Sequence, residues 1–408
     1  MALSAQLRYF RVLAPRLAVA TGRRCLTQPR PRPRPSDNRG WSRTRAYQAT
    51  VGVAAAAFGA SLSAFSLFSK EAEKEKEKDV EESHDKETAK NVEESHEEME
   101  KDEEERHKKE MEDTIIFLLK KAKLNIMKGE LEEAEKILHE SARLSHKADN
   151  KAAIIYTYDT MANLAFLRGQ LDQAEKLFKA AMSFLLAGGM QQDDNAIIEM
   201  SLKLASIYAT QDQHKLALAG YEFCILTLEE KIAKQKDLPT DALSEEERID
   251  TRLLLGLSLD SYARYLLAHN RAALAQKMYE QALQIAMEVH GETHPQTIVL
   301  MNDLATALDA QGHYDDAYEH VKKASELAHQ TEHPEIHIVL NNLAGILMHK
   351  EDFSQAREIY KEALKQAEKT GDGASVRHIR KELAELAKKK KQSRLAKDKQ
   401  ERDKVIDD

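Results

Sequence analysis

Histidine and cysteine are the residues of this 408-residue chain whose side chains could do the most specific chemistry. His329, His333 and His337 are four residues apart, a spacing that can bring imidazoles to one helix face and so to a zinc ion. Pro334 interrupts the run, which places His329 at the end of one helix and His337 in the next. We therefore predict no metal site.

Sequence signals of catalysis are also missing. The two cysteines, Cys25 and Cys224, form no CxxC pair. The chain has no GxGxxG, P-loop, HExxH or GxSxG motif. We predict no catalytic residues, no cofactor and no small-molecule substrate, so the chain is interpreted as a binding protein.

The composition predicts an all-α fold. Charged residues make up 32% of the chain and hydrophobic residues 42%, with abundant Ala, Leu, Glu, Lys and Gln. After residue 35 only Pro239, Pro295 and Pro334 remain of the 8 prolines, so long stretches are free of the residue that breaks helices. An all-β domain and a disulfide scaffold are excluded.

The net charge of −8 conceals a strong segregation along the chain. Residues 1–45 hold eleven arginines and a single acid, Asp37, which is typical of a mitochondrial transit peptide. A basic arm that binds acidic surfaces is the alternative. Because the rest of the chain is acidic overall, we expect no nucleic-acid partner.

Two segments of contrasting character follow. Residues 46–69 carry no charge and would form a helix of about 36 Å, enough to cross a membrane, so we predict a single anchor there; a buried or cleaved apolar segment is the alternative. If the segment spans, the arginine-rich side lies in the matrix. Residues 70–113, rich in Glu and Lys, are predicted to be a charged, disordered spacer.

From residue 114 onward a repeat appears. In six places an alanine stands twelve residues before a second alanine, and a bulky residue follows the second alanine by four. The clearest copy runs Ala162, Gly169, Ala174, Phe178 and Ala181. Small residues let two antiparallel helices approach closely, glycine ends the first helix, and the bulky residue fills the gap to the next pair. One such pair cannot bury its own apolar face, so the copies must stack.

These residues resemble the tetratricopeptide-repeat family, and the period near 42 residues resembles its kinesin light chain type. The phrase Gly291-Glu292-Thr293-His294-Pro295 followed by Asn302-Asp303-Leu304-Ala305 is similar to that type as well. No repeat carries the tryptophan of the family motif, since Trp41 lies in the leader. The resemblance implies a right-handed solenoid of about six tetratricopeptide-type helix pairs. We expect the array over residues 114–370 with a charged insertion at 229–247, a capping helix over 371–387, and a lysine-rich tail over 388–408.

In this family the first helices line a groove that binds partner segments. Positions predicted to face it are Tyr156, Asn163, Phe166, Lys203, Ser206, Arg264, Asn302, Asp303, Asn341, Asn342 and Met348. Asparagine suits such a groove because its amide both donates and accepts hydrogen bonds, as an extended peptide requires. The alternative is that these are only solvated faces of inner helices.

The order of leader, apolar segment, acidic spacer and long repeats resembles mitochondrial members of the family. That resemblance implies an inner-membrane factor that supports respiratory complex III and the turnover of fragments of its Rieske iron–sulfur subunit. Two other functions stay open from the residues alone: a cytosolic cargo adaptor of the kinesin light chain kind and an outer-membrane import receptor.

Overall fold

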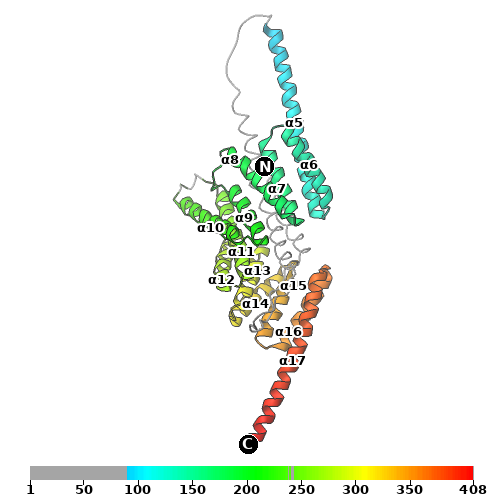
Figure 1. Ribbon diagram of the computed structural model, residues 1–408, viewed down its shortest axis with the longest axis vertical. Helices are drawn as coiled ribbons and strands as arrows, with labels where there is room; N and C mark the ends of the chain where they lie inside the picture. Colours follow the sequence, from blue (N-terminus) through cyan, green and yellow to red (C-terminus); the bar gives the residue numbers. More distant parts are fainter. Residues whose placement is uncertain (1–89, 238, 240–242, 408) are drawn as a thin grey trace. The chain divides into compact units, whose positions relative to one another are not determined.

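The computed structural model describes residues 90–237, 239 and 243–407, and every regular element in these ranges is a helix. The helices are α5 (Lys90–Lys128), α6 (Leu131–Lys147), α7 (Lys151–Leu167), α8 (Leu171–Ala187), α9 (Asn195–Thr210), α10 (His214–Lys236), α11 (Glu245–Ala268), α12 (Ala272–His290), α13 (Pro295–Asp309), α14 (Tyr314–Gln330), α15 (Ile336–His349), α16 (Phe353–Thr370) and α17 (Gly373–Asp407). The all-α prediction is confirmed (Figure 1).

The described chain falls into two compact units, divided after Ala217. The first unit holds α5 to α9 and the first turn of α10, and the second holds the rest of α10 through α17. Within each unit consecutive helices pack against each other, as α7 does on α8 and α15 on α16. This is the stacking of helix pairs that the repeat pattern predicts.

The alanine pattern forms the centre of every helix pair. The paired alanines are all 0% exposed: Ala122, Ala134, Ala162, Ala174, Ala205, Ala217, Ala263, Ala275, Ala305, Ala317, Ala344 and Ala356. The bulky residues four positions later are buried as well, including Phe178, Tyr279 and Tyr360. Because a larger side chain has no room at the alanine positions, the spacing of twelve fixes how the two helices cross.

Each helix pair turns through one residue with left-handed backbone, always five residues before the second alanine. Glycine supplies it in three repeats, with φ between 75° and 85° at Gly129, Gly169 and Gly312. The other three repeats place Asp212, Asn270 and Glu351 there, with φ near 60°. The conformation is a property of the turn, and glycine is only its least strained occupant.

Several element bounds differ from the sequence-based expectation. The charged segment expected to be a disordered spacer over 70–113 is helical from residue 90, because its Glu and Lys are good helix formers and continue directly into the packed part of α5. The insertion at 229–247 is mostly helix, which leaves only residues 237–244 between α10 and α11. The predicted capping helix of 371–387 continues through the lysine-rich tail to Asp407, with Ile379 and Leu386 buried.

Among the described residues, no helix is both long and apolar enough to cross a membrane. The segment predicted as an anchor, 46–69, and the predicted transit peptide, 1–45, lie outside the described residues.

Candidate functional site

The first helix of each pair presents polar side chains at the same places, two to three residues before its central alanine and one residue after it. In the first unit these are Asp159 and Asn163 on α7 and Lys203 on α9, joined by Glu199 one turn earlier. In the second unit they are Asp260, Arg264, Asn302, Asp303 and Asn342 on α11, α13 and α15. We call the first set the first-unit cluster and the second set the second-unit ladder.

The first-unit cluster is a buried ion triad. Lys203 Nζ lies 3.0 Å from Asp159 Oδ1 and 2.9 Å from Glu199 Oε1, and all three side chains are at most 9% exposed. Asn163 Nδ2 donates to Asp159 Oδ2 at 3.0 Å and to the Asp159 carbonyl at 2.8 Å. The contact joins α7 to α9 and so ties two successive repeats together.

The electrostatics of the triad keep its lysine charged. Burial alone would lower the pKa of Lys203, but Asp159 and Glu199 outweigh it and hold the pKa above its ordinary value. Burial raises the pKa of Glu199, and Lys203 only partly offsets that effect. Two carboxylates thus share one ammonium group in the interior.

The second-unit ladder links three successive first helices. Arg264 donates to both carboxylate oxygens of Asp260, at 2.9 and 2.7 Å, and lies 3.4 Å from Asp303 Oδ2 on α13. Asn302 Nδ2 donates to Asp303 Oδ1 at 3.3 Å. Asn342 Nδ2 on α15 then donates to Asn302 Oδ1 at 2.9 Å. Burial acts to lower the pKa of Arg264, yet the two carboxylates raise it, so the guanidinium stays charged.

Most of the predicted groove residues are buried in the array itself. Between 2% and 9% of the residue surface is exposed at Tyr156, Asn163, Phe166, Lys203, Ser206, Asn302, Asn341, Asn342 and Met348. Only the side chains of Arg264, at 19%, and Asp303, at 17%, are more accessible. The structure brings Asn302, Asp303, Asn342 and Arg264 together, and separately Asn163 and Lys203.

The remaining predicted residues make local contacts. Lys123 Nζ lies 4.7 Å above the ring of Tyr156, and Ser206 Oγ donates to the Leu202 carbonyl at 3.0 Å. A role of the buried residues toward a partner stays a prediction, whereas their contacts between repeats are present in the structure.

The sequence did not lead us to three members of these networks, Asp159, Glu199 and Asp260. Glu199 and Asp260 each stand four residues before the cation that they pair with, Lys203 and Arg264, on the same helix. An acid–base pair at that spacing is a readable signal in the sequence.

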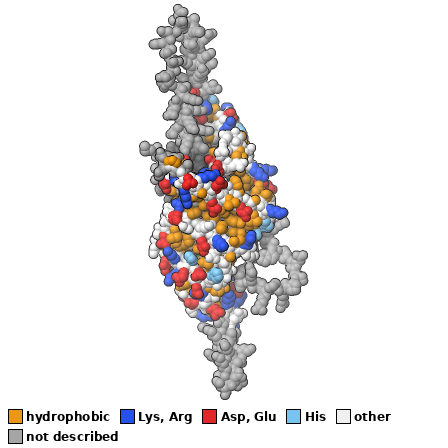
Figure 2. Space-filling view, turned by 90° about the vertical axis from the view of Figure 1, so that its left-hand side faces the viewer, with side chains coloured by type: hydrophobic (Ala, Val, Ile, Leu, Met, Phe, Trp, Pro, Cys, Tyr) orange, Lys and Arg blue, Asp and Glu red, His pale blue; other side chains and the backbone are white. Residues whose placement is uncertain are grey.

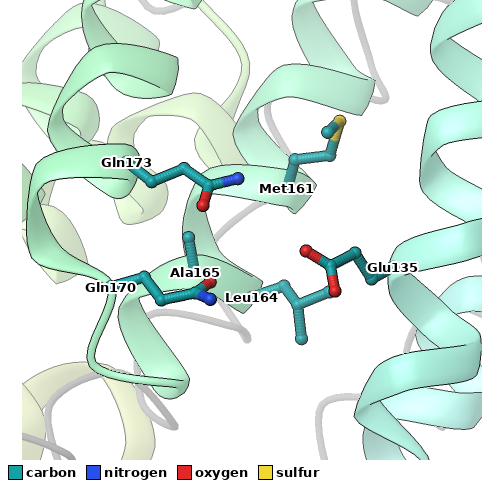
Figure 3. Close-up of a pocket in the computed structure, with 6 residues that line it drawn as sticks. All are labelled: Glu135, Met161, Leu164, Ala165, Gln170 and Gln173. Carbon is teal, nitrogen blue, oxygen red and sulfur yellow. The ribbon is translucent and has the colours of Figure 1, made fainter.

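A small pocket opens in the first unit, and none of the predicted groove residues lines it. Met161, Leu164 and Ala165 form its apolar side, and Glu135, Gln170 and Gln173 bring polar groups to it (Figure 3). Glu135 is already ion-paired with Arg168. Its interior measures about 10 Å³, which holds about one water molecule and no substrate-sized ligand.

The three histidines point to different partners. His329 faces Glu362 at 3.4 Å, His333 Nδ1 accepts from the Glu335 amide at 3.1 Å, and His337 Nε2 lies 3.3 Å from Asp372 Oδ2. Within the ranges that the structure describes, no group of three or more His, Cys, Asp or Glu could hold a metal ion.

Comparison with known families agrees with the repeat architecture. A family model described as tetratricopeptide repeat matches residues 247–330, and a second of the same description matches residues 339–370. The stacked helix pairs and these matches define a tetratricopeptide-repeat protein.

Comparison with similar sequences shows which group of tetratricopeptide-repeat proteins the chain belongs to. The human protein named "Tetratricopeptide repeat protein 19, mitochondrial" is 60% identical over 68% of this chain and 73% of its own length. The Rattus norvegicus protein of the same name is 62% identical over 68% of this chain and 76% of its own. The chain belongs to the family of mitochondrial tetratricopeptide repeat protein 19. Among solved structures, BtubC (BKLC) from P. vanneervenii is similar with a TM-score of 0.43 and 16% identity, covering 56% of this chain and 92% of that one.

Proposed function

We propose that this mitochondrial protein is a non-catalytic maintenance factor of the inner membrane. It binds segments of partner proteins along its first helices and supports respiratory complex III by helping to clear fragments of the Rieske iron–sulfur subunit. The choice of complex III as client rests on the family resemblance. The binding mode rests on the residues of the second-unit ladder.

The observation that carries the binding mode is the Arg264–Asp303 pair. These two side chains join α11 to α13 at 3.4 Å and are the most accessible members of the ladder. A charged pair in contact with solvent can exchange one of its partners for a group of a bound peptide, whereas Asn302 and Asn342 are committed to each other in the interior. We infer that a partner segment is recognised first at Arg264 and Asp303, through its own charged or amide groups.

The membrane part of the proposal concerns residues 46–69, the uncharged segment that precedes the acidic spacer. Tethering by this segment would confine the repeats to the membrane surface and raise their local concentration near an integral membrane complex.

The test is affinity purification of the full chain from mitochondria, with recovery of complex III subunits as the readout. Asp303→Asn removes the charge and keeps a side chain of the same size, and circular dichroism checks that the variant is folded. Glu326→Gln, an equivalent charge loss on the outer face of α14, is the matched control. We expect recovery with the wild type and the control and a loss of at least five-fold with Asp303→Asn. Equal recovery with all three proteins would show that the partner binds at another surface. Absence of complex III from every sample would refute the proposal that complex III is the client.

A further inference from the structure

The outer face of α10 carries a row of exposed apolar side chains. Leu216 is 50% exposed, Phe223 37% and Leu226 65%, and Ala219 between them is exposed as well. We call these four residues the α10 stripe. Figure 2 shows the molecule from the side on which α10 and α12 lie in Figure 1. Hydrophobic side chains gather near the middle of the face that is seen there.

The second helices of the other repeats show whether such a row is a general feature of the array. The repeat aligns them with α10 residue by residue, so equivalent positions can be compared. The α10 stripe occupies the positions one before and two, six and nine after the second alanine. The residues at the equivalent positions of the other five helices are polar or charged, except for Ala180 and Leu274. They are Glu133, Lys136, Glu140 and Arg143 on α6; Gln173, Lys176, Ala180 and Ser183 on α8; Leu274, Lys277, Gln281 and Gln284 on α12; Asp316, Glu319, Lys323 and Glu326 on α14; and Gln355, Glu358, Glu362 and Lys365 on α16. Packing within a repeat therefore does not require apolar residues at these positions, and the α10 stripe is special to its own repeat.

The spacing of the α10 stripe is that of a coiled-coil seam. Its members follow one another by three, four and three residues, which keeps them on one line along the helix. A second helix laid along this line would cover all four side chains.

We propose that the α10 stripe is an interface with a second copy of this chain, in which two α10 helices pair antiparallel. In this register Leu216 lies against Leu226 of the second copy, and the small Ala219 lies against the large Phe223. The same pairs recur on the other side of the two-fold axis, as a symmetric interface requires. Gly220 lies at the axis, where the absence of a side chain lets the two helices approach closely.

The charged residues beside the α10 stripe form attractive pairs in this register, except for Glu222. Lys215 faces Glu229 of the second copy, and the symmetry makes this attractive pair twice. Glu230 at the end of the stripe is already paired with Lys234 at 2.9 Å. Glu222 faces its own counterpart across the axis, a repulsion that keeps the dimer weak and reversible.

The first test is the mass of the full chain in mild detergent, measured by sedimentation velocity over a range of concentrations. We expect a reversible dimer, a dissociation constant at least ten-fold higher for Leu226→Gln, and an unchanged constant for Glu326→Gln at the equivalent position of α14. Glu222→Gln removes the repulsion at the axis and should lower the constant several-fold. Circular dichroism checks that each variant is folded. A monomer at every concentration, or a dimer that Leu226→Gln leaves intact, would overturn the proposal.

The second test fixes the register by cysteine trapping in a Cys25→Ser background, since Cys224 is buried. With diamide as the oxidant, Glu222→Cys should form a disulfide-linked dimer, because its two copies meet at the axis. Glu229→Cys, seven residues further along the same exposed flank, should not. Trapping at position 229 and not at 222 would overturn the antiparallel arrangement.

Discussion

Lys203 on α9 lies 3.0 Å from Asp159 on α7 (Nζ to Oδ1), and both side chains are almost completely buried. The two residues are 44 positions apart in the sequence, yet the stacking of two repeats brings them into direct contact. Glu199 completes the triad at 2.9 Å from the same nitrogen. The triad joins two neighbouring repeats, and removal of its cation would leave two carboxylates buried without compensation.

Replacement of that cation is therefore expected to be costly. Lys203→Met should lower the free energy of unfolding by about 3–5 kcal/mol, because Asp159 and Glu199 remain in the interior. Denaturant unfolding measures the change. Lys179→Met, which breaks the exposed pair with Glu175, is the control and should change stability by less than about 1 kcal/mol. A small effect of Lys203→Met would mean that water reaches the triad.

The hydrogen bond between Asn342 and Asn302 is expected to couple α15 to α13. Asn342→Ala should cost about 1–3 kcal/mol, since it leaves Asn302 Oδ1 without this donor in the interior. A double-mutant cycle with Asn302→Ala measures the coupling, and the double variant should cost less than the sum of the two single ones. Strict additivity would show that the two amides act independently.

Substitutions at the left-handed turn residue are expected to change stability in either direction, depending on whether glycine is introduced or removed. Glu351→Gly should stabilise the protein by about 0.5–1 kcal/mol, because a glutamate at φ 61° is strained. Gly312→Ala at the equivalent turn, where φ is 85°, should destabilise it by about 1 kcal/mol. No atom lies within 4 Å of a Cβ built at Gly312, so the cost there is one of backbone conformation alone. Thermal unfolding of the pair is the measurement, and shifts of the same sign would contradict the account.

His337 should make stability depend on pH. Burial lowers the pKa of His337 below its ordinary value of 6.5, although Asp372 opposes that effect. The unfolded chain thus binds a proton on this ring more readily than the folded chain does. The stability contributed by the neutral ring is complete above pH 6.5 and is lost as the pH falls below it, by at most about 1.4 kcal/mol per pH unit.

Denaturant unfolding between pH 7.5 and 5.5 checks this expectation. His337→Gln should flatten the curve, because glutamine keeps a donor for Asp372 and does not titrate. His139→Gln, on the exposed face of α6, should leave the curve as it is in the wild type. A wild-type stability that rises on acidification in this range would contradict the assignment.

The fold could be predicted from the sequence because its determinants are local and repeated. Two alanines spaced twelve residues apart indicate where the two helices of a pair contact each other. All of the paired alanines are fully buried. The ends of α5 and α17 were harder to predict, since Glu- and Lys-rich segments look disordered by composition and helical by propensity.

The candidate site could be predicted only in part. The register of first helices selected Asn302, Asp303, Asn342 and Arg264, which the structure brings together. It gave no sign that Asn302 and Asn342 would bond to each other, because that contact depends on how far successive repeats rotate. The same geometry determines which polar groups stay accessible, and leaves Arg264 and Asp303 as the accessible pair.

The most direct test of the proposed function is the level of Rieske fragments in mitochondria that lack this protein. We expect fragments to accumulate on complex III, to be cleared on re-expression of the wild type or Glu326→Gln, and to persist with Asp303→Asn expressed at the same level. Mitochondria without the protein that show no accumulation of fragments would contradict the proposal.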